Sequence, residues 1–278
     1  MIQRLFAVAV LFACLAPAGL RGASEDGAIT PTEVIHLFNG KDLNNFYTWL
    51  TDLKYEDPNR VFTIVDQVDG APAIRSSGQV WGGLVTKERY QNYHLIVEFR
   101  WGTATWGARK NKTKDSGILL HCEGPDGNAE ADFNSPWMRS VEFQMIEGGT
   151  GDIILVGGYN KDGSRVIPRV TATTAGDNRV WDPNGTPKEF EGGRINWYGR
   201  DPDWKDVLNF RGRQDVEKPD GQWNRLDAFV DGDSLVYLVN GVIVNKATRS
   251  SLKAGRLLFQ SEGAEVFFRR IELQPLGK

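Results

Sequence analysis

Residues 141–152 read Val141-Glu142-Phe143-Gln144-Met145-Ile146-Glu147-Gly148-Gly149-Thr150-Gly151-Asp152. In the first half, apolar residues alternate with Glu and Gln, which is the pattern of a β-strand with one face in a core. The face with Glu142 and Gln144 is too polar for packing and suits a hydroxylated ligand. Two carboxylates near each other on one strand also suggest acid/base chemistry on a sugar. The glycines after Glu147 end the strand and allow close backbone approach. The alternative is an edge strand whose polar side chains face water.

Similar strand patterns with turn signals between them recur along the chain. We predict strands at residues 60–65, 84–86, 94–100, 117–121, 141–146, 152–156, 225–230, 235–239, 242–246, 256–260 and 265–273. Asn240-Gly241 lies between two of these runs and predicts a type I′ hairpin. No amphipathic helix of ordinary length is evident, which argues against a doubly wound α/β fold. The prediction is an all-β, two-sheet antiparallel β-sandwich of the jelly-roll kind, forming one domain over residues 35–276.

A long segment at residues 157–218 interrupts this pattern. It is rich in Gly, Pro, Asp, Asn and Arg, and its large aromatic residues include Trp181, Trp197, Tyr198 and Trp204. So long a stretch with little periodicity inside a compact domain is usually a functional loop. We therefore predict a long aromatic loop insertion in which Trp197, Tyr198 and Trp204 wall a cleft and stack on a sugar ring.

The N-terminal end has the features of an export signal. An apolar run at residues 5–15 follows the basic start Met1-Ile2-Gln3-Arg4, and Ala16-Pro17-Ala18 supplies a cleavage site. The run is too short to span a bilayer and suits a secretory signal peptide. We predict removal of residues 1–18, a mature start near Gly19, a short N-terminal segment at 19–34, and a periplasmic or secreted protein without a transmembrane segment. The alternative is a lipoprotein signal ending at Cys14.

Composition narrows the class of protein further. The formal net charge is −3 and acids and bases are interspersed, so no basic stripe is available to nucleic acid. Without Cys14 only Cys122 remains, so we expect no intrachain disulfide and a Cys122 that packs as a small apolar side chain. Nine Trp and 31 Gly suit a strand-and-turn protein with aromatic platforms for sugars.

Seven short motifs follow one another along the chain. They are LFNGKDL at residues 37–43, YHLIVEFR at 93–100, DSGILL at 115–120, EFQMI at 142–146, GQWN at 221–224, LVNG at 238–241 and FFRRI at 267–271. With these motifs, in this order and spacing, residues 35–275 resemble the 3-keto-disaccharide hydrolase domain family. The chain differs from the commoner family pattern in the glycine-rich segment at 148–152, in Gln260-Ser261-Glu262-Gly263, and in the aromatic insertion.

The resemblance implies a concanavalin-like sandwich with a concave sugar-binding face. It also implies an oligosaccharide or glycoside substrate already oxidised at C3 by a separate sugar 3-dehydrogenase. A ketone at C3 acidifies the proton on C2, so a modest base can remove it and the glycosidic oxygen on C1 then leaves. Water adds back, and the net result is hydrolysis. Such an enzyme needs a base near C2, donors for the enolate oxygen and an acid for the leaving group.

Three polar residues are the candidates for this chemistry. Glu142 is predicted as a base or acid, Gln144 as an orienting hydrogen-bond donor, and His121 as the partner in proton transfer. His121 shares a strand face with Leu119 and Glu123, opposite Ile118, Leu120 and Cys122. If that apolar set faces the core, His121 and Glu123 are expected to face the cleft. No compact metal-ligand spacing accompanies His121, Glu123 and Glu142, and we predict neither a metal nor a cofactor.

Four further residues are candidates for substrate binding. Arg100 and Glu98 share the polar face of one predicted strand, and Gln260 and Glu262 share that of another. Two other functions remain open. A sandwich with exposed Trp can bind glycans without chemistry. The pattern Glu142-x-Gln144-x-x-Glu147 is similar to the signature of laminarinase-type glucanases, in which a bulge brings the two outer glutamates together.

Overall fold

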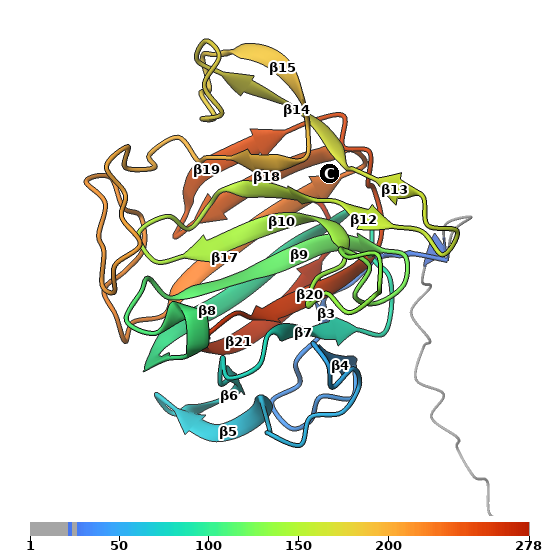
Figure 1. Cartoon of the computed structure of the whole chain (residues 1–278), viewed down its shortest axis with the longest axis vertical. Helices are drawn as coiled ribbons and strands as arrows, with labels where there is room; N and C mark the ends of the chain where they lie inside the picture. Colours follow the sequence, from blue (N-terminus) through green and yellow to red (C-terminus); the bar gives the residue numbers. More distant parts are fainter. Residues whose placement is uncertain (1–21, 24–26, 278) are drawn as a thin grey trace, which may run out of the picture.

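The computed structural model describes residues 22–23 and 27–277 and consists mainly of two facing β-sheets (Figure 1). The predicted signal peptide, the start near Gly19 and the alternative lipid site at Cys14 lie outside the described residues. Within them, the only helical segment is the three-residue 3-10 helix η1 (Gly107–Arg109). The described part of the chain contains no helix with the length and apolar character of a membrane span.

Both large sheets pair their strands in antiparallel fashion. The seven-stranded sheet has the order β16 (Gly193–Ile195), β11 (Ile153–Val156), β10 (Arg139–Ile146), β9 (Asp115–Glu123), β20 (Arg256–Ser261), β7 (Gly82–Thr86) and β4 (Phe46–Leu50). The eight-stranded sheet has the order β19 (Val242–Ala247), β18 (Ser234–Val239), β17 (Asn224–Asp231), β8 (Tyr93–Thr105), β21 (Ala264–Gln274), β6 (Ala71–Ser76) and β5 (Phe62–Val68), with β3 (Ile35–His36) also on β21.

This architecture confirms the predicted all-β antiparallel sandwich. Each of the eleven predicted strands corresponds to an observed strand, with boundaries that differ by a few residues. The hairpin between β18 and β19 turns at Asn240 and Gly241, whose φ angles are 50° and 83°. A type I′ turn requires positive φ at both central residues, which is why the Asn-Gly pair predicts it.

Alternation along β10 places its two faces in different environments. Val141, Phe143 and Met145 are fully buried between the sheets. The Phe143 ring stacks on Tyr237 of β18 in the other sheet, with ring centroids 4.2 Å apart and planes 2° apart. Burial of each such side chain stabilises the fold by about 1.5–3 kcal/mol. Glu142 and Gln144 therefore point to the opposite, outer face of the seven-stranded sheet.

Residues 157–218 are more ordered than the predicted aromatic loop. The segment contains β16 and four further strands, which are β12 (Gly158–Tyr159), β13 (Arg165–Val166), β14 (Arg169–Thr174) and β15 (Thr186–Glu191). β14 and β15 form a hairpin that projects from the sandwich at the top of Figure 1. β14 is rich in Val and Thr, which favour extended backbone. These Val and Thr residues are too few to be recognised as a strand pattern among the turn residues around them.

Candidate active site

Three carboxyl groups gather on the outer face of the seven-stranded sheet, which we call the acid face. Glu142 lies on β10, Asp115 begins the neighbouring β9, and Glu262 directly follows β20 on the other side of β9. The Gln144 amide donates a hydrogen bond to Asp115 Oδ1 over 2.7 Å. Glu142 and Gln144 are only 4% and 3% exposed. The cluster is therefore recessed and largely shielded from water.

Gly117 of β9 makes room for this cluster. It stands directly opposite Gln144 in the pairing of β9 with β10. A Cβ atom at this position would lie 2.4 Å from Glu142 Oε1 and 2.4 Å from Gln260 Oε1. Gln260 in turn hydrogen-bonds the Glu142 carboxyl group. Glycine at position 117 therefore leaves the space that the Glu142 and Gln260 side chains occupy above β9.

The environment holds the carboxyl groups at different pKa values. Burial, together with the nearby Asp115 charge, raises the pKa of Glu142 to about 8, although Arg194 and the Gln260 hydrogen bond oppose the shift. Burial also raises the pKa of Asp115, but Arg109 and the Gln144 hydrogen bond limit the value to about 6. The pKa of Glu262 is raised well above its ordinary range by burial and by both neighbouring acids. Near neutral pH Glu142 holds a proton while Asp115 is mostly ionised, which is the condition for an acid and a base in one site.

Two arginines supply positive charge to the same face. Arg109 of η1 lies 3.4 Å from Asp115 and 3.0 Å from Asp206. Arg194 of β16 stands opposite Ile154, which itself stands opposite Glu142, and it pairs with Asp152 over 3.1 Å. Preorganised cations of this kind can stabilise an oxyanion that develops during a reaction. In the described residues no group of three or more His, Cys, Asp or Glu side chains is arranged to hold a metal ion.

The rest of the acid face is apolar and aromatic. A buried cluster covers the sheet beside the carboxyl groups, and it consists of Trp49, Val85, Leu119, Cys122, Met138 and Leu258. Trp137 packs against it and stacks on Trp81, with ring centroids 6.2 Å apart and planes 28° apart. Both indoles are partly exposed. An exposed indole pair beside buried polar groups is a suitable platform for a sugar ring.

His121 does not face this cluster, so its expected orientation is wrong. Its φ angle is 55°, and the pairing of β9 shifts register on both sides at this point. The bulge turns the fully buried ring towards Tyr93 of the other sheet, 5.9 Å away, with Nδ1 3.1 Å from the Leu252 carbonyl oxygen. Burial lowers the pKa of His121 to about 4. The same bulge turns Cys122 to the acid face, where it is still a buried apolar group.

Arg100 and Glu98 lie on the opposite outer face of the sandwich. Both belong to β8 of the eight-stranded sheet, whose Phe99 and Trp101 point into the core. Arg100 pairs with Asp69 over 2.6 Å, and Glu98 pairs with Arg269 over 2.7 Å. The expectation that they share a site with Glu142 is therefore corrected, because alternation identifies a polar face but not the sheet to which it belongs. Gln260 and Glu262, in contrast, are beside Glu142 as expected.

The three aromatic residues expected to wall the cleft separate in the structure. Trp197 is 2% exposed and belongs to the hydrophobic core, which contradicts its expected place at the surface. Tyr198 is 56% exposed and contacts Trp181 with ring centroids 6.4 Å apart. Trp204 is partly buried, with its indole N–H 3.1 Å from the Glu147 carbonyl oxygen and Arg200 over its ring. Arg200 binds Asp152 and so links Trp204 to the acid face, and the Trp197 backbone N–H also donates a hydrogen bond to Asp152 over 2.8 Å.

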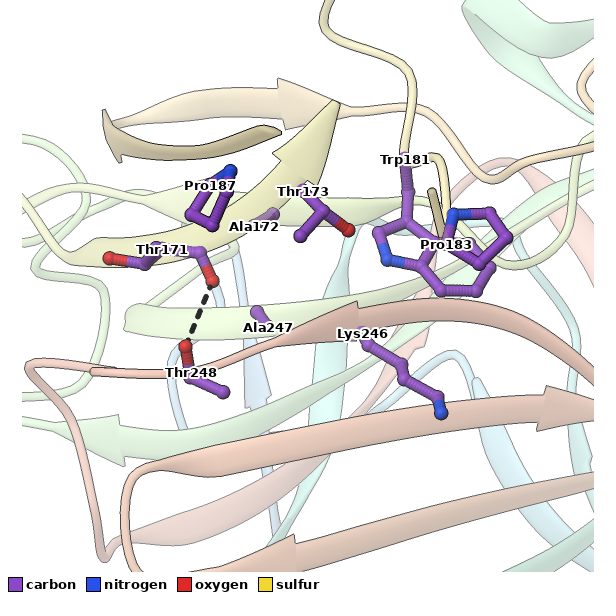
Figure 2. A pocket seen from close by; sticks show the side chains of 9 residues that line it. All are labelled: Thr171, Ala172, Thr173, Trp181, Pro183, Pro187, Lys246, Ala247 and Thr248. Carbon is purple, nitrogen blue, oxygen red and sulfur yellow. Dashed lines mark hydrogen bonds between the residues drawn. The ribbon is translucent and has the colours of Figure 1, made fainter. Parts of the chain in front are cut away.

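A pocket of about 290 Å³ lies between the β14–β15 hairpin and β19 (Figure 2). Trp181, Pro183 and Pro187 form its apolar part, and Lys246 and three threonines are the polar lining residues. Thr248 donates a long hydrogen bond to the Thr171 carbonyl oxygen across it. No carboxyl group lines this pocket, so it is separate from the acid face and cannot supply the same proton transfer.

Glu147 is turned away from Glu142. The pairing of β10 with β9 is continuous from Val141 to Ile146, so no bulge brings the two glutamates together. Glu147 is fully buried and accepts a hydrogen bond from the Lys114 ammonium over 2.7 Å. The nucleophile and acid arrangement of a laminarinase-type enzyme is therefore not formed by these two residues.

The sequence reasoning missed three residues of the cluster. Asp115 opens the motif DSGILL, and its position before an apolar strand was the signal that could have identified it. Arg109 and Arg194 come from short irregular segments without a strand pattern, and only the folded chain brings them together.

The fold and the cluster together define an antiparallel sandwich with a recessed carboxyl site on one outer face. Residues 33–274 match the model of the 3-keto-alpha-glucoside-1,2-lyase-like domain. The chain therefore belongs to this family of carbohydrate-active domains.

The chain is similar to many solved structures. One is a candidate glycosyl hydrolase from Parabacteroides distasonis, with 16% identity, a TM-score of 0.47, and coverage of 88% of this chain and 94% of that chain. Another is a carbohydrate-binding module from Bacillus subtilis, with 9% identity, a TM-score of 0.41, and coverage of 82% and 94%. No curated protein sequence matches the chain.

Proposed function

We propose that this protein cleaves 3-keto-glycosides or 3-keto-disaccharides by elimination followed by hydration. The observation that carries the proposal is the pair Asp115 and Glu142, which share one recessed cluster but have pKa values of about 6 and about 8. Two carboxyl groups whose environments separate their pKa values can act as base and acid at the same pH. Membership of the 3-keto-alpha-glucoside-1,2-lyase-like family supports the choice of substrate.

In the proposed reaction Asp115 removes the proton from C2, which the C3 ketone acidifies. The electrons of that C–H bond first form an enolate with the C3 ketone. Collapse of the enolate restores the ketone and forms the C1–C2 double bond while the C1–O bond breaks, and Glu142 protonates the departing oxygen. Arg109 and Arg194 stabilise the enolate that develops on the C3 oxygen. Water then adds to C1 and a proton returns to C2, so the net reaction is hydrolysis. Gln144 and Gln260 hold the two carboxyl groups in position through the contacts described above.

Asp115 takes the role for which His121 was the sequence candidate. The His121 ring is fully buried against Tyr93 and its lowered pKa keeps it neutral at physiological pH. Asp115 is instead hydrogen-bonded to Gln144 and lies beside Arg109. A base must reach the proton that it removes, and this requirement favours Asp115.

The alternative function is sugar binding without chemistry. The partly exposed stack of Trp81 and Trp137 favours it, since paired indoles are a common platform for sugar rings. A pure binder has no use for a buried carboxyl group that holds its proton at neutral pH, and this cost of burial supports catalysis instead.

The test is to incubate the purified protein with glucosides and with their 3-keto derivatives and to identify the products. We expect cleavage of the keto derivatives only. Deuterium at C2 should slow the reaction or be washed out into water, because the C2–H bond breaks. Equal turnover of unoxidised glucosides would remove the keto-assisted route, and binding without turnover of either would favour the binding function.

The proposed reaction requires a source of oxidised substrate and a protein located where that substrate is found. The substrate must come from a dehydrogenase that oxidises C3 of a glucoside, since this chain is not proposed to carry out that oxidation. Export to the periplasm or the medium follows from the predicted signal peptide. Mass spectrometry of the mature protein should place its N-terminus near Gly19, and a lipid on Cys14 would identify the other signal class.

A further inference from the structure

A pocket of about 400 Å³ lies at the end of the acid face where the Trp81 and Trp137 indoles stack. Trp81 lines this pocket, and its polar lining residues are Thr51, Asp52, Gln79, Glu130 and Asn134. None of these residues has a part in the proposed proton transfer. The position of the pocket relative to the carboxyl cluster therefore decides what it can bind.

One row of outward-facing residues leads across the sheet from the carboxyl cluster to this pocket. Continuing the pairing of β9 with β20 places Glu262 opposite Asp115, and continuing that of β20 with β7 places Trp81 opposite Glu262. The Thr51 N–H donates a hydrogen bond to the Trp81 carbonyl oxygen over 2.9 Å, which extends the row to β4. Residues opposite each other on antiparallel strands point to the same face. Asp115 and Trp81 are two strand spacings apart, about 10 Å, a length that two linked sugar rings span.

The packed apolar cluster of the acid face does not lie on this row. Leu258 stands between Leu119 and Val85 in a separate row, four residues further along the strands and about 13 Å away. Between the two ends of the first row stands Glu262, which is itself a member of the carboxyl cluster and is partly exposed. The row therefore becomes more open from Asp115, which is 7% exposed, towards the pocket.

The proposed acid is directed towards the same side of the sheet. A Cβ atom on Gly117 would lie 2.4 Å from the side-chain oxygens of both Glu142 and Gln260, so the Glu142 carboxyl group lies over β9 and close to β20. In the sheet order β20 stands between β9, which carries Asp115, and β7, which follows Trp81. An oxygen that Glu142 protonates therefore belongs to a group that can extend over β20 to Trp81.

The polar residues of the pocket suit a neutral, hydroxylated group. In the part of the chain that the structure describes, the Glu130 carboxylate and the Gln79 amide nitrogen have no hydrogen-bond partner. Asp52 accepts a hydrogen bond from the Asn134 amide over 2.7 Å, and Lys54 donates to the oxygen of the same amide over 2.5 Å. Carboxylates accept hydrogen bonds from hydroxyl groups and repel an anion, so two of them in the pocket favour a neutral polyol.

We propose that Trp81 and this pocket form the subsite for the leaving group, and that the group bound there is a neutral sugar ring. Trp81 provides a flat apolar surface for the ring, and Gln79 and Glu130 provide a donor and an acceptor for its hydroxyl groups. This inference rests on the proposed function, because a keto ring at Asp115 is what places its C1 substituent over the row. Substrates with a sugar as leaving group are then preferred to those with a small or an anionic one.

The experiment compares leaving groups of different size at the same linkage. We measure kcat/KM for 3-keto-maltose, oxidised in its non-reducing ring, and for methyl 3-keto-α-glucoside, and for the β-linked pair made from cellobiose and methyl β-glucoside. Loss of an aromatic ring contact weakens binding by about threefold to tenfold, so the disaccharide-to-methyl ratio should fall by about that factor in Trp81→Ala. A disturbance of the carboxyl cluster slows both substrates alike and cancels in the ratio.

Trp223→Ala is the matched control. Trp223 is partly exposed on the opposite outer face, where it contacts Arg269, and its loss should leave the ratio as in the wild type. Trp81→Phe keeps an aromatic ring and should retain most of the ratio, whereas Glu130→Ala should lower it by a smaller factor than Trp81→Ala. An unchanged ratio in a folded Trp81→Ala overturns the proposal, and if that variant does not fold, an unchanged ratio in Glu130→Ala does so.

Failure of the proposed function has a different signature. The wild type would then cleave none of the four substrates, and the subsite is tested by binding of the unoxidised sugars. In calorimetric titrations maltose or cellobiose should bind more tightly than the methyl glucoside of the same anomer, and Trp81→Ala should remove the difference. Equal binding of disaccharide and methyl glucoside to the wild type would reject the subsite.

Discussion

The two outer faces of the sandwich have similar sequence patterns and opposite electrostatics. On the eight-stranded sheet each charged group of β8 has a partner, as in Glu98–Arg269 and Arg100–Asp69. On the acid face three carboxyl groups share one recess, and among the residues that the structure describes only Arg109 lies within ion-pair distance of any of them. Polar alternation therefore identifies an outward face, and the pairing of its charges distinguishes a surface of ion pairs from one with a recessed carboxyl cluster.

The pKa values show the same contrast. Hydrogen bonds from Arg100 and Trp223 lower the pKa of Asp69. Burial raises the pKa of Asp227, but hydrogen bonds from His94 and Arg225 outweigh this effect, and the net result is a lowered pKa. Glu142 is more deeply buried than either and its neighbours include other acids, so its pKa rises to about 8. The paired face stabilises ionised carboxylates, and the acid face stabilises a protonated one.

The largest effect is expected for Glu142→Gln. The change keeps the shape and hydrogen-bonding capacity of the side chain but removes its proton transfer. General acid/base catalysis contributes about a hundred- to ten-thousand-fold, so kcat/KM on a 3-keto-glucoside should fall within that range with an unchanged fold. Glu98→Gln is the same substitution on the paired face and should leave the rate as it is. Full activity in Glu142→Gln would remove this residue from the mechanism.

Gly117→Ala should have the next largest effect. The added methyl group would lie 2.4 Å from the side-chain oxygens of both Glu142 and Gln260, so both must move. Displacement of a catalytic group by about 1 Å can cost a hundredfold in rate. We expect a loss of that size in kcat/KM. Gly157→Ala places its methyl group no closer than 3.6 Å to any neighbour and serves as the control. A normal rate in Gly117→Ala would show that the cluster tolerates this movement.

The pH dependence of stability provides a third prediction. The pKa of Glu142 rises from its ordinary 4.5 to about 8 on folding, so the folded state holds a proton that the unfolded state releases. Stability must then fall as the pH rises from 4.5 to 8, because the unfolded state binds fewer protons in that window. The Glu142→Gln variant has no titrating group at this position and so does not lose this stability as the pH rises. Its melting temperature relative to the wild type should increase steadily between pH 5 and pH 8.5, whereas a constant difference would contradict the raised pKa.

The smallest effect is expected for the stability of Glu98→Gln. The side chain pairs with Arg269 at a partly exposed site, and such pairs contribute about 0–1 kcal/mol to the free energy of unfolding. Urea unfolding at low and at high salt should show a small loss that decreases as salt screens the pair. A loss of several kcal/mol in the free energy of unfolding would mean that the Glu98–Arg269 pair is shielded from water, as the carboxyl groups of the acid face are.

Several features of the fold and site could be predicted from the sequence because they depend on local rules. Alternation along 141–146 is enough to place Val141 and Phe143 in the core and Glu142 outside it. Asn240-Gly241 specifies its turn through backbone sterics alone. Gln260 and Glu262 were placed near Glu142 because the last strands of a sandwich return beside the first.

Other features depended on contacts between distant segments. A register shift of one residue at His121 reversed the side on which its ring lies, and nothing in DSGILLHCE specifies that bulge. Trp197 packs in the core, and its backbone N–H donates a hydrogen bond to the buried Asp152, a contact between residues 45 positions apart.

By itself, the sequence determined the all-β class, the faces of the regular strands, the Asn-Gly hairpin and the candidate Glu142. The tertiary structure alone decided which polar face holds the recessed carboxyl cluster. Side-chain period depends on neighbouring residues in one strand, whereas a pKa depends on every charge and every layer of protein around a group. Asp115 and Arg194 act on Glu142, and Arg109 acts on Asp115, from three separate segments, and their combined burial and charge exist only after the sheets have formed.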